Sequence, residues 1–303
     1  MSRIFKSIAV LIMALSAAVA FAQDVMLKPF VLASKGAGDV AQKVEATKAA
    51  LSKAGFTVAG SYSPYANTTV IGITNDELRN TAAKSEHGGF GAAMRVAVVK
   101  AGSDVQVSYT NPPYWANVYR MNGELRDTAA KLQAALGKVE EFGAKGLTAE
   151  QLRKYHYAFG MEYFHEDNEF VKYGSHDEAV KAVEAGLAAG KHGVTKVYRV
   201  DVAGKKEVLF GVAMKGTGDS KMMDDAYLMS EIDFKDVKSA AHLPYDILVS
   251  DNKVYGQYAR FRIAVSFPDL SMMGANSFMN IMKSPEAIRE ALAMTVGGKK
   301  DAR

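Results

Sequence analysis

The densest group of possible metal ligands in the sequence is the run His165-Glu166-Asp167-Asn168-Glu169, with one imidazole and three carboxylates. Together with His156, the side chains of His165 and Glu166 are the candidate ligands of a divalent metal. The run is not an H-E-x-x-H motif, because its fifth residue is Glu169 and two imidazoles cannot lie one helical turn apart. A solvated acidic turn after a helix is the alternative interpretation, and it is favoured.

Methionines form a second group that could bind metal, because thioether sulfur is a soft ligand for Cu(I). They are concentrated in the second half of the chain, at Met222, Met223, Met229, Met272, Met273, Met279 and Met282. The alternative is that these side chains fill gaps in a hydrophobic core. The spacing of Met279 and Met282 suits the inward face of a helix, so core packing is the favoured interpretation.

Loops that leave the end of a predicted sheet are the best candidates for a ligand site. In the run 111–115, Asn111 is followed by two prolines and then by Tyr114 and Trp115, whose rings offer flat amphipathic surface. Asp269 holds a similar place in the second half, and Tyr157 belongs to an aromatic-rich linker. The alternative is that the only tryptophan is half-buried and packs at the start of a helix.

Two arginines, Arg260 and Arg262, alternate with apolar residues in a predicted strand and would point to the same side of it. They could bind an anion bidentately, although an exposed sheet face with arginines is favoured. The glycine-containing run 215–221 lacks the spacing of a phosphate loop. The sequence also contains no G-x-S-x-G motif, so no catalytic signature is recognised and no cofactor is predicted.

Composition excludes several classes of chemistry. The absence of cysteine rules out disulfides, thiolate catalysis, thiolate zinc sites and iron–sulfur ligation. The formal net charge is +4, and losing Arg3 and Lys6 with a leader lowers it to +2. Without a dense cluster of Lys and Arg, nucleic acid is not an expected partner.

Residues 1–22 have the pattern of a cleaved export signal. Arg3 and Lys6 precede an apolar run that is too short to span a bilayer comfortably, and Ala20-Phe21-Ala22 is a small-x-small cleavage pattern. We therefore expect a periplasmic or secreted protein without a transmembrane segment after cleavage.

The chain also repeats itself loosely. A block over residues 29–137 is echoed by one over 169–297, with Val107-Ser108-Tyr109 matching Val265-Ser266-Phe267 and Met121-Asn122 matching Met279-Asn280. A repeat of this size indicates duplication of a small domain. We expect a first repeat over 23–143, a linker helix over 144–168 and a second repeat over 169–303. The two repeats would pack about a pseudo-two-fold axis, as a dimer does.

Hydrophobic periodicity predicts an α+β fold in which each repeat reads β-α-β-β-(α)-β-β-α, an antiparallel sheet packed against helices. Strands are predicted over 56–62, 68–74, 94–98, 105–109, 194–200, 208–214, 245–249 and 261–267. Asp39 and Ser175 are expected N-caps of helices, and either Asn75 or Asp76 can cap a third. The run 148–151 fits a capping box that would begin the linker helix. The aromatic residues that follow should pack against one of the repeats or line the seam between them.

Several segments resemble the bacterial family known as domain of unknown function 302. They are Gly55-Phe56-Thr57-Val58, Met94-Arg95-Val96 and residues 107–112 in the first half, and residues 243–249 and 260–270 in the second. The resemblance covers about two-thirds of the mature chain and implies a small α+β domain with a TATA-binding-protein-like topology. It brings no established activity and no catalytic residues. Residues 216–241 are an insertion relative to the short form of that domain.

The functional expectation is an exported binding module that holds a small molecule or an envelope protein at the seam between its repeats. The alternative is a protein that binds copper or zinc, or a metal-dependent periplasmic enzyme. A purely structural role in an envelope complex, or a homodimer, is also open.

Overall fold

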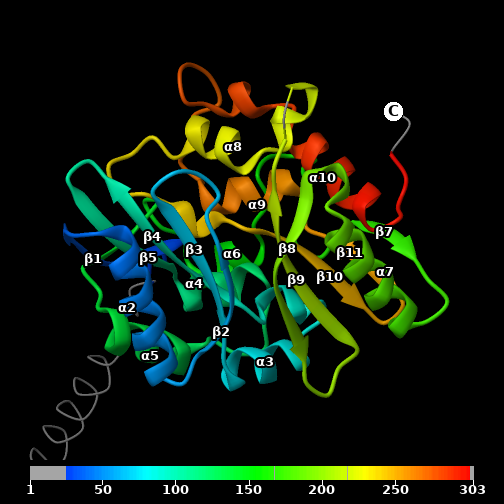
Figure 1. Cartoon of the computed structure of the whole chain (residues 1–303), viewed down its shortest axis with the longest axis horizontal. Helices are drawn as coiled ribbons and strands as arrows, with labels where there is room; N and C mark the ends of the chain where they lie inside the picture. The colour runs from blue at the N-terminus through cyan, green and yellow to red at the C-terminus, as the bar shows by residue number, and fades with distance from the viewer. Residues whose placement is uncertain (1–24, 167, 217, 301–303) are drawn as a thin grey trace, which may run out of the picture.

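The computed structural model describes residues 25–166, 168–216 and 218–300, so the predicted leader lies outside the described residues. Eleven strands form two sheets (Figure 1). Those of the first sheet are β1 (Phe30–Ala37), β2 (Thr57–Tyr62), β3 (Thr68–Thr74), β4 (Met94–Ala101), β5 (Asp104–Thr110) and β6 (Glu140–Phe142). Those of the second sheet are β7 (Glu169–Lys172), β8 (Val194–Val202), β9 (Glu207–Met214), β10 (Tyr245–Ser250) and β11 (Lys253–Gly256).

Helices connect and cover these strands. The α-helices are α2 (Val40–Lys53), α3 (Asp76–Ala83), α4 (Pro112–Val118), α5 (Arg126–Leu136), α6 (Ala149–Arg153), α7 (His176–Ala189), α8 (Asp225–Ile232), α9 (Ala259–Ser266) and α10 (Ser284–Thr295). Short 3-10 helices are η1 (Gly88–Gly91), η2 (Lys191–Gly193), η3 (Gly218–Met223), η4 (Ala240–His242) and η5 (Phe278–Ile281). No helix in the described ranges has the length and apolar character that a bilayer crossing requires.

Both sheets are antiparallel, which confirms the predicted α+β class. Their strand orders are β2-β3-β4-β5-β1-β6 and β8-β9-β10-β11-β7. In both sheets the second to fifth strands of the half follow one another, and the first strand (β1 or β7) lies beside the fifth. The register also corresponds: Gly72 pairs with Arg95 between β3 and β4, and Gly211 pairs with Asp246 between β9 and β10. The pairing of edge strand β2 shifts register between Val58 and Gly60, and that of edge strand β8 shifts register at the corresponding place, between Lys196 and Tyr198.

Local sequence explains where the helices begin. The side chains of Asp39, Asn75 and Ser175 accept hydrogen bonds from backbone N–H groups in the first turns of α2, α3 and α7, as predicted. Thr148 and Gln151 form the predicted capping box of α6. That helix ends at Arg153, however, so most of the predicted linker helix is irregular chain.

One predicted strand is wrong. Residues 261–267 lie in and just after helix α9, not in a strand, and Arg260 and Arg262 therefore do not share a sheet face. Seven of the eight residues of α9 are buried, which removes the polar face that normally reveals a helix. The strand that corresponds to β5 is β11, so the match between 107–109 and 265–267 does not align equivalent elements.

A second correction concerns the stretch after β5. Residues 112–118 form α4, where a loop was expected, and the last helix of the first repeat is α5, which begins at Arg126. A proline at the first position of α4 has its φ angle preset for a helix. The pair α4 and α9 then follows the equivalent strands β5 and β11 in the two halves.

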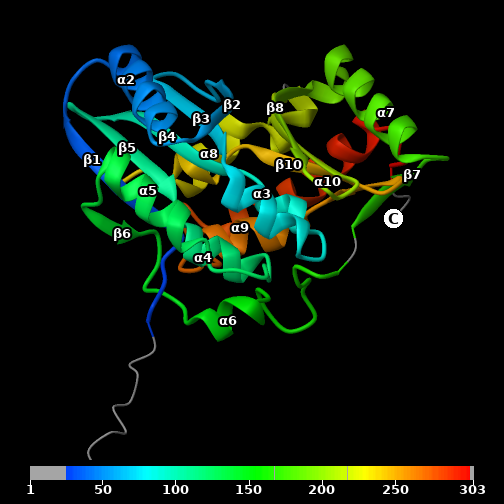
Figure 2. The ribbon, with the colours of Figure 1, turned by 90° about the horizontal axis from the view of Figure 1, so that it is seen from below.

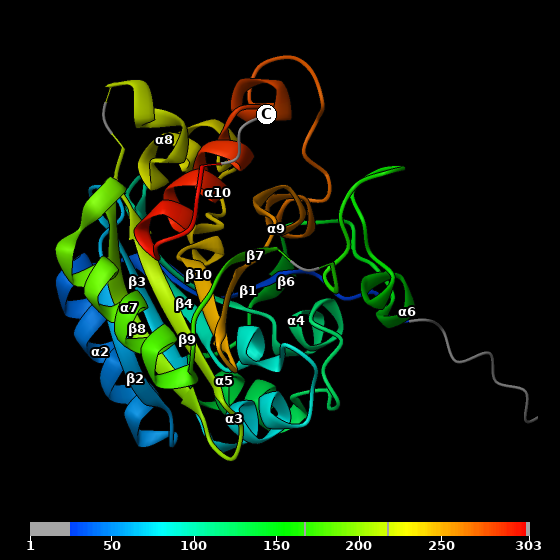
Figure 3. The ribbon, with the colours of Figure 1, turned by 90° about the vertical axis from the view of Figure 1, so that its right-hand side faces the viewer.

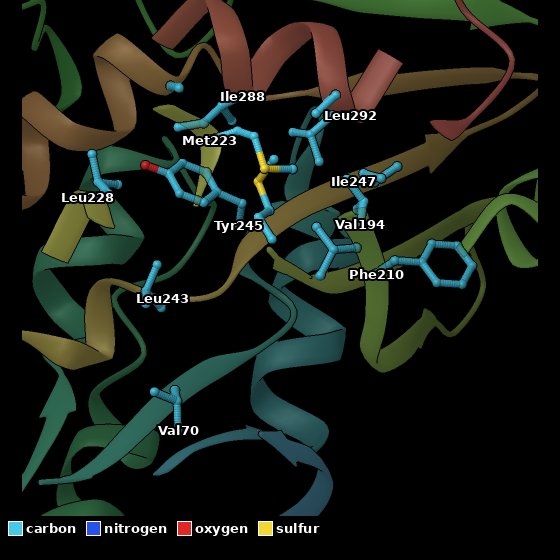
Figure 4. Close-up of a cluster of buried hydrophobic side chains, with 14 of the residues drawn as sticks. Val70, Val194, Phe210, Met223, Leu228, Leu243, Tyr245, Ile247, Ile288 and Leu292 are labelled. Carbon is cyan, nitrogen blue, oxygen red and sulfur yellow. The ribbon is translucent and has the colours of Figure 1, made fainter. Parts of the chain in front are cut away.

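The two halves share their hydrophobic cores. One buried cluster joins Phe30, Leu32 and Val70 of the first sheet to the residues between the second sheet and α7 and α10. Among the residues labelled in Figure 4, Val70 belongs to the first half and the others belong to the second. The other cluster lies beneath α2 and α5 and includes Tyr198 and Leu248 of the second sheet. Helices α2 and α7 lie on one side of the molecule and α4, α9 and α6 on the other (Figure 3).

Candidate functional site at the seam

We define the seam as the contact between the first half (residues 25–143) and the second half (residues 168–300). Edge strands β2 and β8 meet there, and the ring of Tyr198 lies against Gly72 and Gly211, one glycine from each sheet. A Cβ atom added to either glycine would overlap that ring. Gly60, which faces Gly72 in the pairing of β2 with β3, equally leaves no room beside Val197. The glycines allow a close approach of the two halves.

A buried ion-pair cluster lies beside this contact. Arg95 of β4 pairs with Asp246 of β10, and Arg262 of α9 donates from Nη1 to Oδ2 of the same carboxylate at 3.0 Å. The three side chains are each at most 1% exposed. Tyr198 completes the coordination by donating to Oδ1 of Asp246 at 3.2 Å. Two cations therefore share one anion in the interior.

Arg262 is held by further contacts from both halves. Its Nη1 lies 3.0 Å from the hydroxyl of Tyr119 and from Oε1 of Gln257, and its Nη2 donates to the carbonyl of His242 at 2.7 Å. The guanidinium carbon is 5.1 Å from the ring centre of Trp115, a cation–π contact. Trp115 therefore packs against a charge from the other half.

His242 adds no positive charge to this cluster. Burial and the neighbouring Arg262 and Arg95 guanidiniums hold its pKa well below the ordinary value, so the imidazole is neutral. Its ring nitrogens lie 2.8 Å from Oγ of Ser266 and 3.2 Å from the hydroxyl of Tyr245. The cluster of two arginines and one aspartate keeps a net charge of +1.

The linker between the halves covers one side of the cluster with aromatic rings, as the sequence predicted. Phe164 lies 5.2 Å from Tyr119, 6.1 Å from Phe90 and 6.3 Å from Phe261, measured between ring centres. Helix α6 of the same linker packs against α4 (Figure 2). Phe159 is the exception, because it is fully exposed.

Two hollows lie beside the linker, and together they form what we call the seam cavity. The inner hollow also borders both halves, and the outer hollow borders the first half. The inner hollow has room for about one water-sized group. It is lined by His87, Phe90, Tyr163, Phe164, Glu166, Asn168, Tyr255, Gly256, Gln257, Tyr258 and Phe261. The outer hollow, of about 250 Å³, is lined by Glu86, His87, Arg120, Asn122, Phe164 and His165. His87 and Phe164 line both.

Two side-chain carboxamides line the inner hollow, and the N–H groups of each have no acceptor. Asn168 and Gln257 both line it, and their amide nitrogens are buried without a hydrogen-bond partner. The amide oxygens are occupied, because Arg289 donates from Nε to Asn168 at 3.0 Å and Arg262 donates to Gln257. Buried unsatisfied donors are rare in folded proteins and need an explanation.

A larger hollow of about 540 Å³ lies elsewhere, between α4, α6 and the start of the described chain at Val25. Residues of the second half do not line it. Among the described residues that do, none holds a buried polar atom without a partner. The seam cavity is therefore the better candidate site.

The structure places three of the predicted ligand-binding residues in the interior. Tyr114 donates to the carbonyl of Val265 at 2.6 Å, which joins α4 to α9. Trp115 donates from Nε1 to the carbonyl of Pro29 at 3.0 Å, and Asn111 donates to Lys28 and Glu141. Because all three are buried, they support the seam and do not present a surface to a ligand.

The other predicted ligand-binding residues are dispersed. Tyr157 stacks on Phe278 at 5.7 Å between ring centres, and Arg260 pairs with Glu162 of the linker at 2.8 Å. Asp269 accepts a hydrogen bond from the backbone of Lys145 at 2.9 Å. Only Arg262 of the predicted set belongs to the buried cluster.

The predicted metal ligands His156 and His165 flank the ring of Tyr163, at 4.6 and 5.5 Å between ring centres, and Glu166 lies nearby on the exposed linker. Over the described ranges, no group of three or more His, Asp and Glu side chains is placed to hold a metal ion. Asp167, which belongs to the predicted run, lies outside the described residues.

The methionines divide into two groups. Met223 and Met229 are buried in the core, as predicted, whereas Met272, Met273, Met279 and Met282 are exposed, and Met222 is half-buried between these extremes. The interpretation of Met279 and Met282 as an inward helix face is therefore wrong. They lie in and beside η5, a short turn that leaves these side chains in solvent.

Comparison of the chain with protein-family models and with curated proteins gives no match. The functional inference therefore rests on the geometry of the seam. The two unpartnered amides of the seam cavity, Asn168 and Gln257, were not among the predicted site residues. Gln257 carried no motif, and Asn168 was noted only as part of an acidic run.

Proposed function

We propose that this protein is a binding module that holds a small molecule in the seam cavity. The observation that carries the proposal is that three separate segments build one cavity: His87 and Phe90 from the first half, Tyr163 and Phe164 from the linker, and Tyr255 to Phe261 from the second. Ligand sites are typically apolar, with a few placed polar groups, and often lie between structural units. The seam cavity contains placed polar groups and lies between structural units.

The correspondence of strand order and register supports duplication of one α+β unit as the origin of the two halves. Duplication would create such a cavity at the junction, where each copy contributes different side chains. The resemblance to domain of unknown function 302 is compatible with this proposal. The leader-like composition of residues 1–22 supports export to the periplasm or the medium.

A ligand panel tests the proposal. The mature chain, residues 23–303, is screened by thermal shift and by native mass spectrometry against small molecules. In His165→Trp the new ring would fill the outer hollow, so binding should be lost. Val139→Trp, at an exposed position away from the cavity, is the control and should bind normally. Hits that bind both variants equally would place the site elsewhere, and a panel without a hit would contradict the proposal.

A further inference from the structure

We infer that the seam cavity selects ligands that carry a carboxylate on a flat, unsaturated body. This inference rests on the proposed function and names the ligand class. It depends on three features of the described residues: two amide donors with fixed orientation, an excess positive charge behind one of them, and aromatic walls.

The orientation of both amides is fixed by arginine. An amide side chain usually can be turned over to exchange its oxygen and nitrogen. Here Arg262 donates to Oε1 of Gln257 at 3.0 Å and Arg289 donates to Oδ1 of Asn168 at 3.0 Å, and an arginine has no acceptor to offer a turned amide. The nitrogens Nε2 and Nδ2 are therefore left as donors, both buried and both without a partner.

The two amides line the same hollow and come from neighbouring backbone segments. The backbone N–H of Gly256, adjacent to Gln257, donates to the carbonyl of Asn168 at 3.1 Å. Because the inner hollow has room for about one water-sized group, the two side-chain N–H donors suit one oxygen of a carboxylate, which accepts several hydrogen bonds. A hydroxyl or an amine would bring its own donors into the same space.

Charge points to an anion. Arg95 and Arg262 share only Asp246, so the buried cluster has one positive charge in excess, and Gln257 is the direct link from Arg262 to the cavity. A buried charge without a counter-ion is unfavourable, and an anion one side chain away relieves it. The guanidinium also polarises the amide and strengthens its N–H as a donor.

Rim charges are mixed. Glu86 and Glu166 face the cavity together with Arg120, His87 and His165. Both glutamates are exposed, so solvent and salt screen them. The uncompensated charge is the buried one.

The walls specify the rest of the ligand. The inner hollow takes about one water-sized group, and Phe90, Phe164 and Phe261 line it with ring surface. The outer hollow of about 250 Å³ has room for a small ring system. The phenyl ring of Phe164 and the imidazoles of His87 and His165 in its wall offer flat faces to a planar body.

Matched ligand pairs test the inference by isothermal titration calorimetry. The carboxylates are benzoate, phenylacetate, cinnamate and indole-3-acetate, and the partners are the corresponding primary amides and amines. We expect at least one carboxylate to bind about tenfold or more tightly than its partners, since a hydrogen bond to a charged group contributes about 1.5–3 kcal/mol. Amides or amines that bind equally well would overturn the inference and leave the proposed function standing. If no compound in the set binds, the inference is overturned as well, and the wider panel alone then decides the proposed function.

Two variants locate the effect. Gln257→Glu and Asn168→Asp replace each donor by a carboxylate that can pair with Arg262 or Arg289, so folding should be retained. Carboxylate binding should fall by about tenfold or more in each. Gln133→Glu, an exposed position on α5, makes the same charge change and is the control. Equal affinity in Gln257→Glu, Asn168→Asp and Gln133→Glu would overturn the assignment to these amides.

Discussion

Arg95 and Asp246 occupy equivalent positions in the two halves, and they form an ion pair with each other. Each is the second residue of its strand, β4 or β10, and each pairs in register with a glycine of the neighbouring strand. A contact between equivalent positions lies on a local two-fold relation, as in a symmetric dimer. Here the two sides of that contact have opposite charges.

Asp246 should be more important for folding than Arg95. Asp246→Asn leaves two buried guanidiniums without an anion, whereas Arg95→Met leaves the neutral pair of Asp246 and Arg262. We expect Asp246→Asn to lower the free energy of unfolding by about 3–5 kcal/mol and Arg95→Met by about 1–2 kcal/mol. Urea unfolding followed by circular dichroism measures both. A larger loss in Arg95→Met would contradict the charge count of the cluster.

The close approach of the sheets makes Gly72 sensitive to a single methyl group. In Gly72→Ala the new Cβ would overlap the ring of Tyr198, and we expect a loss of about 1–3 kcal/mol in the free energy of unfolding. Gly36→Ala is the matched control, because no atom lies within 4 Å of its Cβ position. The double variant Gly72→Ala with Tyr198→Ala should cost less than the two single losses together. Strict additivity would mean that the ring and the glycine do not interact.

Stability should fall as the pH rises from about 4 to about 7. Burial raises the pKa of Asp225 to about 7, although hydrogen bonds from the backbone of Met214 and from Tyr62 oppose the shift. The folded chain then holds a proton that the unfolded chain has already released, so the free energy of unfolding decreases through this range and levels off above it. Burial raises the pKa of Asp233 to about 6 and acts in the same direction.

Asp225→Asn removes that titration while keeping a neutral side chain of the same shape. Urea unfolding at a series of pH values should show a shallower decrease in the variant than in the unmodified chain. The remaining slope would include the contribution of Asp233. An unchanged slope would show that Asp225 is ionised in the folded protein.

Exposed methionines should be oxidised before buried ones. Met273 is 75% exposed and Met223 is 3% exposed, and Met272, Met279 and Met282 belong with the exposed group. With limiting peroxide, peptide mapping by mass spectrometry should find sulfoxide first at these four positions and at Met26, which is 49% exposed. Early oxidation of Met223 or Met229 would contradict their burial in the core.

The sequence predicted the parts of the fold that depend on local patterns. Strand β3 has the predicted bounds, and the caps at Asp39 and Asn75 were recognised because each places a side-chain acceptor before an apolar helix stripe. Helix α9 could not be recognised in this way. Arg262 points into a buried ion pair, and with Ser266 it mimics the alternation of a strand, although Ser266 in fact donates to the carbonyl one helical turn before it.

The site was much less predictable. Gln257 and Asn168 are 89 positions apart in the sequence, and neither belongs to a recognised motif. Their role as donors follows from arginines that reach them only in the folded chain. Tyr114 and Trp115 were predicted to bind a ligand because large aromatic residues often do so. The same size also favours burial, and both side chains are buried in the structure.

The opposite charges of Arg95 and Asp246 make each half unsuited to pairing with itself. Two copies of the first half arranged in this way would bring two guanidiniums together, and two copies of the second half would bring two carboxylates together. In two copies of the second half, both Tyr198 rings would need the space that one ring fills against Gly72. In the first half the position that corresponds to Tyr198 is Gly60, which has no side chain. Joining the two halves in one polypeptide therefore ensures that each first half always has one second half of opposite charge to pair with.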